Sequence, residues 1–439
     1  MKFSRTKKKI ISILPKNPSN MIKAITGTKD TLPSEINKWY LLENLVKKIF
    51  SCYNYKEIRT PVFEETALFC RGIGTSTDIV SKEMYTFIDR RETSLTLKPE
   101  MTASVVRSFI ENAMDKKQSL NKLFYISPMF RQERPQAGRF RQFHQFGAEA
   151  LGSNDPLLDA EMIIMAYNII SNIGLKNLEV KINSLGVPES REKYKTELRK
   201  FLAGKEAGLS EDSKKRIDTN ILRIFDSKDE NDQKIMADAP LLINHLDDES
   251  IAHFEKVKKV LDSLKIPYTV DPKLVRGLDY YTNTTFEIIS GSVGSQSALC
   301  GGGRYNLLVE QLGGGAIPGI GFAAGIERIL LACENENVLN LPEEKIDVYV
   351  VRLDKELDAE AYLLAESLRK ENLQVEVDYL LRSVKAQMRE ANRLNAKYAL
   401  FFGGEEYSSG EAVLKNMSEG TEEKINIKDS LSIISKIQR

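Results

Sequence analysis

The 439-residue sequence predicts an α+β domain with an antiparallel sheet, interrupted by a helical insertion and followed by a separate α/β domain. Three observations predict this fold class. Strand and helix patterns mix up to Leu185, strand signals nearly vanish between Gly186 and Ile266, and strands alternate regularly with helices after Lys345. The chain is too long for a single core, because domains usually span about 100 to 200 residues.

The first domain is expected to cover residues 21–185 and to be completed by residues 267–335. One amphipathic helix is predicted at 34–53, and short strands are predicted at 57–62 and 123–130. Glycine-rich, sheet-like sequence returns in the second part, so the chain is expected to re-enter the same sheet. The two parts should then form one active site.

The insertion, residues 186–266, is rich in Lys, Glu, Asp and Asn at helical spacing. The last domain, residues 345–439, is expected to hold a largely parallel sheet. Its predicted elements are strand 347–352, helix 357–370, strand 374–379, helix 383–394 and strand 398–402.

The helix at 383–394 has two stripes of different character. Val384, Met388 and Ala391 share one face and are expected to face the core. A second face carries three cations, which form either a solvated surface or an RNA-facing surface: Lys385, Arg389 and Arg393.

Composition excludes several classes of function. Lys plus Arg (63) balance Asp plus Glu (62), so nucleic-acid contacts must come from local basic patches. No apolar run of about 18 residues is present, which argues against a membrane function. The four cysteines form no CxxC pair, so neither disulfides nor a zinc ribbon is expected, and a reducing cytoplasm fits.

Residues 1–20 form a basic segment that we interpret as a disordered arm. Its apolar stretch at 10–14 is too short for the core of a signal peptide. A transit peptide is the alternative, and the excess of Lys over Arg and Ser argues against it.

Common nucleotide and hydrolase motifs are missing. The sequence has no GxxxxGK[ST] loop, and the glycines of GIGFAAG at 319–325 are wrongly spaced for a dinucleotide fingerprint. The three histidines show no HExxH spacing and no serine elbow is found, so metalloprotease and triad chemistry have no support.

The segment FRQERPQAGRFRQFHQFGAE, residues 130–149, is the most informative. Pro135 and Gly138 predict a turn between two antiparallel strands. The turn is flanked by charged residues suited to a polyphosphate: Arg131, Glu133, Arg134, Arg139 and Arg141. The alternative is an exposed hairpin with surface salt bridges.

Strand parity places Phe143, Gln145, Gly147 and Glu149 on one face of this hairpin, while His144 points away. The aromatic ring of Phe143 suits a flat base. The amide of Gln145, the space above Gly147 and the carboxylate of Glu149 then suit a small polar substrate beside it. Guanidinium groups at the turn would then surround a triphosphate.

Two further segments weaken the salt-bridged alternative. LVRGLDYYT, residues 274–282, places Arg276 after an apolar run, with Tyr280 and Tyr281 beyond it. GIGFAAGIERIL predicts a strand that turns into a helix, whose first turn carries Glu327 and Arg328. Arg328 is then well placed to pair with terminal phosphates.

These segments together resemble histidyl-tRNA synthetases of the bacterial type, from about Ile22 to the C-terminus. Three are similar to the motifs of class II aminoacyl-tRNA synthetases: EIRTPVFE, FRQERPQAGRFRQF and GIGFAAGIERIL. Two more are similar to the signatures of the histidine family: LVRGLDYYT and CGGGRYNLL. The first motif, with Pro61, implies a homodimer interface.

The resemblance implies a two-step reaction. Histidine attacks the α-phosphate of ATP to give histidyl-adenylate and pyrophosphate, and the acyl group then moves to tRNA(His). Mg²⁺ is expected to accompany ATP, with no dedicated metal site on the protein. The last domain then binds the anticodon, which favours RNA contact by the cationic stripe, and the acceptor stem contacts the catalytic domain and the insertion.

The family pattern also implies roles for individual residues. Arg131 and Arg276 act as the catalytic pair on either side of the α-phosphate. The residues implied for ATP are Arg131, Glu133, Arg139, Phe143 and Arg328. The residues implied for histidine are Glu100, Thr102, Gln145, Glu149, Tyr281 and Tyr305.

Two of these assignments have alternatives. Glu149 is either an imidazole ligand or a buried structural acid. Tyr280 competes with Tyr281 for the imidazole, because neighbouring residues of a strand face opposite sides. The sequence also departs from the family at Lys98 and Met101, in place of Arg and Gly in LRPEGT, and at Asn306 and Leu307, in place of Asp-Gly.

The competing function is that of a regulatory subunit of ATP phosphoribosyltransferase, which keeps the synthetase fold without catalysis. Such subunits usually lack the anticodon domain and lose signature residues, whereas this chain keeps Arg131, Arg276, Arg328 and the final α/β unit. Another synthetase of the same subclass is disfavoured by LVRGLDYYT.

Overall fold

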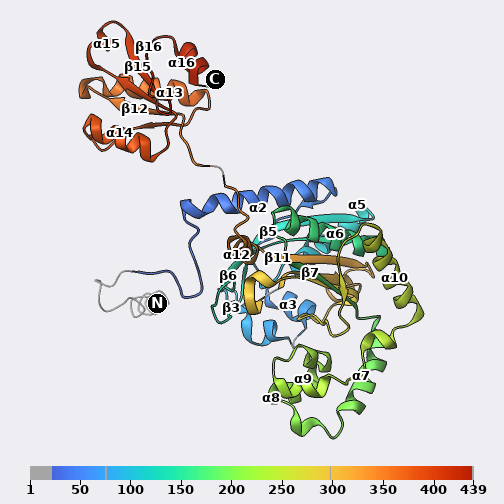
Figure 1. The fold of residues 1–439 in the computed structure, drawn as a ribbon. Helices are drawn as coiled ribbons and strands as arrows, with labels where there is room; N and C mark the ends of the chain where they lie inside the picture. The colour runs from blue at the N-terminus through green and yellow to red at the C-terminus, as the bar shows by residue number, and fades with distance from the viewer. Residues whose placement is uncertain (1–21, 75–76, 297, 342, 438–439) are drawn as a thin grey trace. The chain divides into compact units, whose positions relative to one another are not determined.

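The computed structural model describes residues 22–74, 77–296, 298–341 and 343–437 (Figure 1). The chain forms two compact units, Met1–Asn340 and Leu341–Arg439, and each is described by itself. The predicted basic arm, residues 1–20, lies outside the described residues. The predicted domain limits stay predictions, although the division after Asn340 falls in the segment expected to join the domains.

An eight-stranded sheet forms the first unit. Its strands, in spatial order, are β1 (Lys56–Glu57), β5 (Asn121–Phe130), β6 (Gln142–Leu151), β11 (Gly319–Gly325), β10 (Ala298–Arg304), β9 (Thr282–Ser290), β7 (Leu178–Ser184) and β8 (Thr269–Val270). All pairs from β5 to β7 are antiparallel, as predicted. β6 pairs with β11 across the insertion, so the chain does re-enter one sheet.

Four helices pack on one face of this sheet through a common apolar core. They are α2 (Pro33–Cys52), α6 (Pro156–Asn172), α10 (Asp248–Ser263) and α12 (Ile326–Glu336). In α2, Leu42, Val46 and Phe50 recur every four residues and are fully buried, which explains how the helix lies on the sheet. The opposite face of the central strands stays available for a site.

The strand predicted at 57–62 is wrong in extent. The backbone pairs with β5 at Lys56 and Glu57, and the Ile58 amide still donates to Phe124 O at 2.8 Å, but the ladder then ends. Pro61 has no N–H and restricts Thr60, which prevents a longer strand. A second sheet begins here, in the order β2 (Phe63–Glu65), β4 (Ser94–Leu97) and β3 (Tyr85–Ile88).

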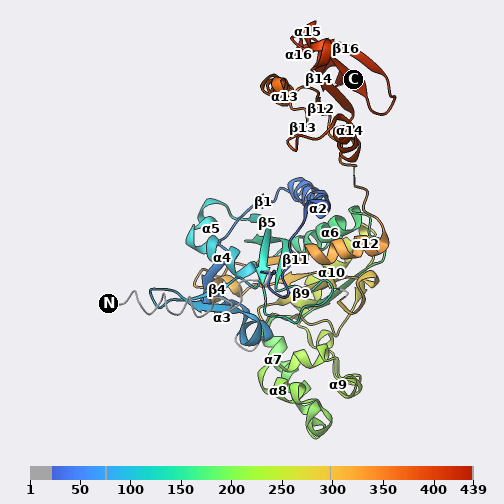
Figure 2. The ribbon, with the colours of Figure 1, turned by 90° about the vertical axis from the view of Figure 1, so that its left-hand side faces the viewer.

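The helical insertion forms a cluster that protrudes from the sheet in both views (Figures 1 and 2). Its elements are α7 (Pro188–Leu202), η2 (Glu206–Gly208), α8 (Glu211–Thr219), η3 (Ile221–Asp226), α9 (Glu230–Met236) and η4 (Leu242–His245). The next helix, α10, lies within the predicted insertion, but its Phe254, Val257 and Leu261 belong to the core of the sheet. The remaining elements of the unit are α3 (Thr66–Ile73), η1 (Ile79–Glu83), α4 (Thr102–Glu111), α5 (Met114–Lys117), η5 (Gly291–Gln296) and α11 (Leu308–Gln311).

The second unit is the expected α/β domain. Its elements are β12 (Val348–Arg352), η6 (Lys355–Leu357), α13 (Asp358–Lys370), β13 (Val375–Val377), α14 (Val384–Arg393), β14 (Tyr398–Phe402), α15 (Gly404–Ser408), β15 (Glu411–Asn416), β16 (Glu422–Asn426) and α16 (Ser430–Ile437). The strands β13, β12 and β14 are parallel, as predicted, and β15 and β16 add an antiparallel edge that the sequence analysis missed.

In α14 the predicted core stripe is only partly correct. Ala391 is buried and Met388 is half-buried, whereas Val384 in the first turn stays 39% exposed. Gln387 occupies the buried position instead, where its side chain bonds to the backbone N–H and C=O of Arg352 at 2.9 and 3.0 Å. The cationic stripe is exposed, which fits both a solvated and an RNA-facing surface.

Candidate active site

A cavity of about 190 Å³ lies on the free face of the sheet, lined by stretches that are far apart in sequence. All the residues assigned to ATP or histidine except Glu149 line it: Glu100, Thr102, Arg131, Glu133, Arg139, Phe143, Gln145, Arg276, Tyr281, Tyr305 and Arg328. Arg134 and Arg141, the other two arginines of the turn segment, are not among the lining residues. Glu149 lies just behind the lining, where it bonds to Thr102 and Tyr305. The structure therefore brings together all the residues assigned to ATP or histidine.

The hairpin of β5 and β6 provides one wall through strand parity. Phe143 and Gln145 face the cavity, while Phe146 and Ala148 face the apolar core. Glu149 shares the cavity side, as predicted. The turn also forms as predicted, with Gln136 bridging Arg139 and with Gly138 at φ +68°.

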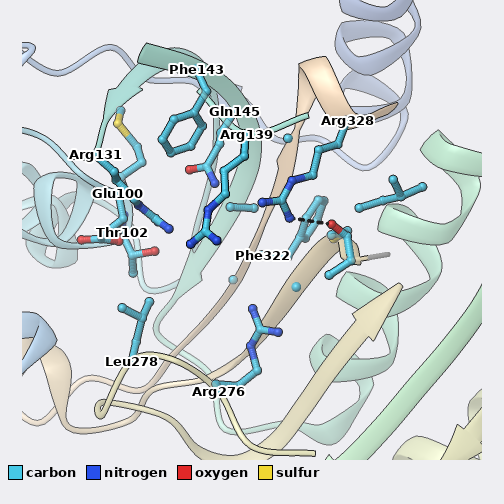
Figure 3. A pocket seen from close by; sticks show the side chains of 18 of the residues that line it. Glu100, Thr102, Arg131, Arg139, Phe143, Gln145, Arg276, Leu278, Phe322 and Arg328 are labelled. Atoms are coloured by element: carbon cyan, nitrogen blue, oxygen red, sulfur yellow. Dashed lines mark hydrogen bonds between the residues drawn. The ribbon is translucent and has the colours of Figure 1, made fainter. Parts of the chain in front are cut away.

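Four arginines surround the hollow, and Arg276 reaches in from the side opposite Phe143 and Gln145 (Figure 3). Burial lowers the pKa of Arg131. Burial, followed by the neighbouring cations Arg131 and Arg139, lowers the pKa of Arg328. Guanidinium groups stay charged in proteins, so these crowded cations favour a polyanionic ligand.

Each arginine is held by the protein before any ligand enters. Arg131 Nε donates to Pro99 O at 2.9 Å, and its guanidinium lies 5.3 Å from the centre of the Phe143 ring. Arg328 Nε and Nη1 donate to Gly138 O and Ala298 O at 3.1 and 2.9 Å. Arg139 pairs with Glu133. Such fixed donors need little reorganisation during a reaction.

Arg276 forms a salt bridge with Glu287 of β9, a residue that the sequence analysis missed. Burial lowers the pKa of Arg276, but Glu287 together with Tyr281, Cys300 and Asp226 raises it above its ordinary value. The guanidinium lies directly over Gly301, where an added Cβ would come within 2.1 Å of Nη2. Glycine at this position of the GGG signature is therefore required for the approach of Arg276.

The far end of the cavity gathers hydroxyl groups around a buried acid. Thr102 Oγ1 and Tyr305 OH donate to Glu149 at 2.7 and 2.5 Å, and Tyr125 OH lies at 3.5 Å. Burial raises the pKa of Glu149 to about 8, against the lowering effect of these hydrogen bonds. Glu100 accepts from Thr102 N and Ala103 N at 2.7 and 3.0 Å, at the start of α4, and burial raises its pKa.

The choice between Tyr280 and Tyr281 rested on strand parity, and that argument is wrong. Both tyrosines line the cavity, with ring centres 4.7 Å apart. They lie in a turn before β9 begins at Thr282, where side chains do not alternate between two faces.

Lys98 and Met101, which differ from the family pattern, contact each other. The Lys98 side chain is fully buried, and its Nζ lies 3.5 Å from Met101 Sδ and 3.4 Å from Thr60 O. Burial lowers the pKa of Lys98 to about 8. Met101 lines the cavity, so its bulk is part of the amino-group loop.

His144 points away from the main cavity, as predicted. Its backbone N–H and its Nδ1 contact Glu327 at 2.9 and 3.0 Å, and its ring meets Trp39 edge to face. Further lining residues were missed: Tyr125, Leu278, Leu299, Cys300 and Phe322. Leu278, Cys300 and Phe322 lie within the motifs, but their side chains do not by themselves indicate a binding role. In the described ranges, no group of three His, Cys, Asp or Glu side chains is arranged for a metal ion, and no helix is long and apolar enough to span a membrane.

An antiparallel sheet with an arginine-lined cavity, joined to a separate α/β unit, is the arrangement of a class II aminoacyl-tRNA synthetase. A family model described as histidyl-tRNA synthetase matches residues 27–329, and one described as anticodon binding domain matches residues 347–437. The chain belongs to the histidyl-tRNA synthetase family.

Relatives and solved structures agree with this membership. A histidine–tRNA ligase of Halothermothrix orenii is 49% identical over 95% of this chain and 99% of its own length. One of Geobacillus sp. is 50% identical, covering 91% of this chain and 95% of its own. Apo histidyl-tRNA synthetase of Staphylococcus aureus has a TM-score of 0.81 at 40% identity, over 95% of this chain and 100% of that one.

Proposed function

We propose that this chain is an aminoacyl-tRNA ligase that activates L-histidine with ATP and transfers it to tRNA(His). The observation that supports this function best is the cavity itself, in which Arg131, Arg276 and Arg328 meet beside the buried Glu149. One end therefore suits a polyphosphate, and the other suits a small ligand with two polar nitrogens.

In the first step, the histidine carboxylate attacks the α-phosphate of ATP. Arg131 and Arg276 lie on different walls and would neutralise the charge that builds up on the phosphorus oxygens. Phe143 stacks on adenine and Glu133 helps to hold the nucleotide, while Arg139 and Arg328 bind the β- and γ-phosphates. Mg²⁺ enters with ATP as part of the substrate.

Histidine is selected at the hydroxyl-rich end. Glu100, Thr102 and Gln145 would hold the amino group, and Gln145 Oε1 is buried with no protein partner. Glu149 and Tyr281 pair with the two imidazole nitrogens, and Tyr305 closes the pocket. A different side chain would leave these buried groups unpaired, which provides specificity without editing.

The second unit would bind the anticodon of tRNA(His), with Lys385, Arg389 and Arg393 as candidate contacts because they lie exposed on α14. We also infer a cytoplasmic enzyme, as expected for a translation component.

A homodimer is supported by exposed apolar side chains on α2 and the small sheet. Phe63 and Phe87 lie opposite Leu97 and Leu95 of β4, two residues apart, so both project from the same face. The exposed set is Tyr40 at 55%, Val62 at 41%, Phe63 at 48%, Phe87 at 45% and Ile88 at 63%. The joint exposure of Phe63 and Phe87 on one face favours a protein interface.

The regulatory-subunit alternative is disfavoured by the intact arginine set and by the anticodon-binding unit at 347–437. Pyrophosphate exchange into ATP, measured with each amino acid separately, tests the proposal. We expect exchange with histidine alone. Exchange with none would favour the regulatory function, and exchange with another amino acid would overturn the assignment of the pocket.

A further inference from the structure

The loop at 271–281 carries Arg276 and Tyr281, yet it contains only turns and bends. No ladder or helix fixes its backbone, so its shape depends on groups outside it. One anchor comes from the sheet, where Asn183 Nδ2 of β7 donates to Leu274 O at 3.0 Å. The sheet also accepts from Asp271 N through Ile182 O at 2.9 Å, and α3 accepts from Asp279 N through Ile73 O at 3.3 Å. Further anchors come from the helical insertion.

Arg191 lies in the first turn of α7, and its Nη1 donates to Tyr281 O at 2.7 Å. Arg191 is half-buried, and burial lowers the pKa of its guanidinium. A charge-assisted bond to a backbone carbonyl fixes the peptide on which the Tyr281 side chain stands. The same peptide leads directly into β9 at Thr282.

A second anchor joins the insertion to the 271–281 loop and to the residue before η1. Asn220 Nδ2 donates to Asp279 Oδ1 at 2.5 Å, and Arg223 pairs with Asp78 at 3.3 Å. The end of α3 and the loop also approach each other closely, since a Cβ on Gly74 would come within 2.7 Å of Asp279 Oδ2.

The insertion also shares an apolar core with the cavity wall. Tyr194 and Leu198 of α7 belong to the same cluster of buried side chains as Tyr280, Tyr281 and Tyr305. A displacement of α7 would therefore reach the histidine end of the cavity through packed side chains and through the Arg191 bond.

We propose that Arg191 is a positioning residue for histidine activation, which holds Tyr281 and Arg276 of the 271–281 loop in their reactive arrangement. The insertion is then a structural part of the amino-acid pocket, in addition to the RNA contacts expected of it. The inference rests on the proposed function, because its readout is histidine-dependent exchange.

Arg191→Met tests the proposal in the full chain by pyrophosphate exchange. We expect the KM for histidine to rise about tenfold or more and kcat to fall, because a charge-assisted bond is lost. The KM for ATP should stay within about twofold, since Arg139, Phe143 and Arg328 lie on other elements. Arg199→Met, an exposed arginine of the same helix, is the matched control and should resemble the unsubstituted chain.

Two more variants separate positioning from plain stability. Arg191→Lys should recover part of the histidine KM, and Asn220→Ala should shift it in the same direction by a smaller factor. A purely structural role would lower the melting temperature and the active fraction while leaving the KM for histidine unchanged. That result in Arg191→Met and Asn220→Ala would overturn the inference.

If Arg191→Met does not fold, Arg191→Lys and Asn220→Ala decide by the same criterion. A failure of the proposed function looks different, because the unsubstituted chain would then give no histidine-dependent exchange.

Discussion

Arg276 is the residue on which the proposed chemistry depends most. It lies between Glu287 and the glycine floor of β10 and faces Arg131 across the cavity. We expect Arg276→Ala to slow adenylate formation about 100- to 1000-fold, as the loss of one fixed donor to a developing negative charge does elsewhere. Single-turnover formation of histidyl-adenylate measures this directly, and circular dichroism checks the fold. Full turnover in this variant would remove the catalytic assignment.

A substitution at a neighbouring glycine perturbs the Arg276 guanidinium without removing it. Gly301→Ala adds a Cβ that would overlap Arg276, whereas Gly291 has open space around its Cβ position. Gly301→Ala should therefore lower the rate and Gly291→Ala should not. Equal rates in the two variants would contradict the close approach of Arg276 to β10.

Glu149 makes a prediction about pH. Burial raises its pKa to about 8, above the value of about 4.3 in an unfolded chain. The folded state therefore binds more protons between these values, so the contribution of Glu149 to stability is present at low pH and is lost as pH rises toward 8. We expect Glu149→Gln to gain stability relative to the unsubstituted chain as pH rises from 5 to 9.

Urea unfolding followed by the fluorescence of Trp39, the single tryptophan, measures this difference within the first unit. Glu197→Gln on the surface of α7 is the control, because the pKa of Glu197 is lowered by its hydrogen bond to Lys200 and its charge does not change above pH 5. A difference that does not depend on pH would show that Glu149 is ionised throughout.

At the scale of elements, β10 is joined to α6 and α10 by a buried ionic cluster. Arg304 and Asp159 are both fully buried, and His253 Nε2 lies 3.0 Å from Asp159. Arg304 also donates to Ser153 O at 2.8 Å. The CGGGRY signature thus supplies a structural arginine next to the pocket residue Tyr305.

Arg304→Met would leave Asp159 buried beside His253 alone. We expect the free energy of unfolding to fall by about 3–5 kcal/mol, as when one partner of a buried pair is removed. Lys200→Met, which breaks an exposed pair with Glu197, should cost less than about 1 kcal/mol. Chemical unfolding of both variants, monitored at Trp39, is the measurement. A loss for Arg304→Met as small as that for Lys200→Met would contradict the role of the cluster.

The elements also show what sequence patterns can and cannot predict. Long periodic segments such as α2 and strands that lead into a turn such as β5 were predicted within a few residues. The antiparallel strands β15 and β16 were missed, and in β16 the exposed positions carry mostly charged residues. The strand at 57–62 failed at Pro61, where local backbone chemistry overrides the apolar pattern.

The sequence likewise predicted some residues of the site and missed others. Residues within recognisable motifs, such as Arg131 and Arg328, were predicted because spacing and charge mark them. Glu287 and Tyr125 were missed because only the tertiary fold brings them to Arg276 and Glu149. Tyr280 was judged by a strand rule in a segment that is a turn.

At the scale of the whole molecule, the exposed apolar face predicts a dimer. Phe63 shares this surface with Phe87. Phe63→Glu would bury an unpaired charge in the interface, so we expect a monomer by size-exclusion chromatography with light scattering. Leu264→Glu, 57% exposed at the end of α10, should leave the mass unchanged. A dimer that survives Phe63→Glu would place the interface elsewhere.

The division of the chain into two units makes a final prediction about the two chemical steps. Every residue that lines the cavity lies between Glu100 and Arg328, within the unit that ends at Asn340. The second unit has its own apolar core of β12, α13, β14 and α16 residues. A chain that ends at Asn340 should therefore fold and retain histidine-dependent pyrophosphate exchange within about threefold, because no group that acts on ATP is removed.

Charging of tRNA(His) by the same fragment should fall by about 100-fold or more, since anticodon contacts and their phosphate interactions are lost. If the fragment charged tRNA(His) as fast as the full chain does, the second unit would have no part in RNA binding. If it folded but lost exchange, the cavity would depend on contacts from the second unit.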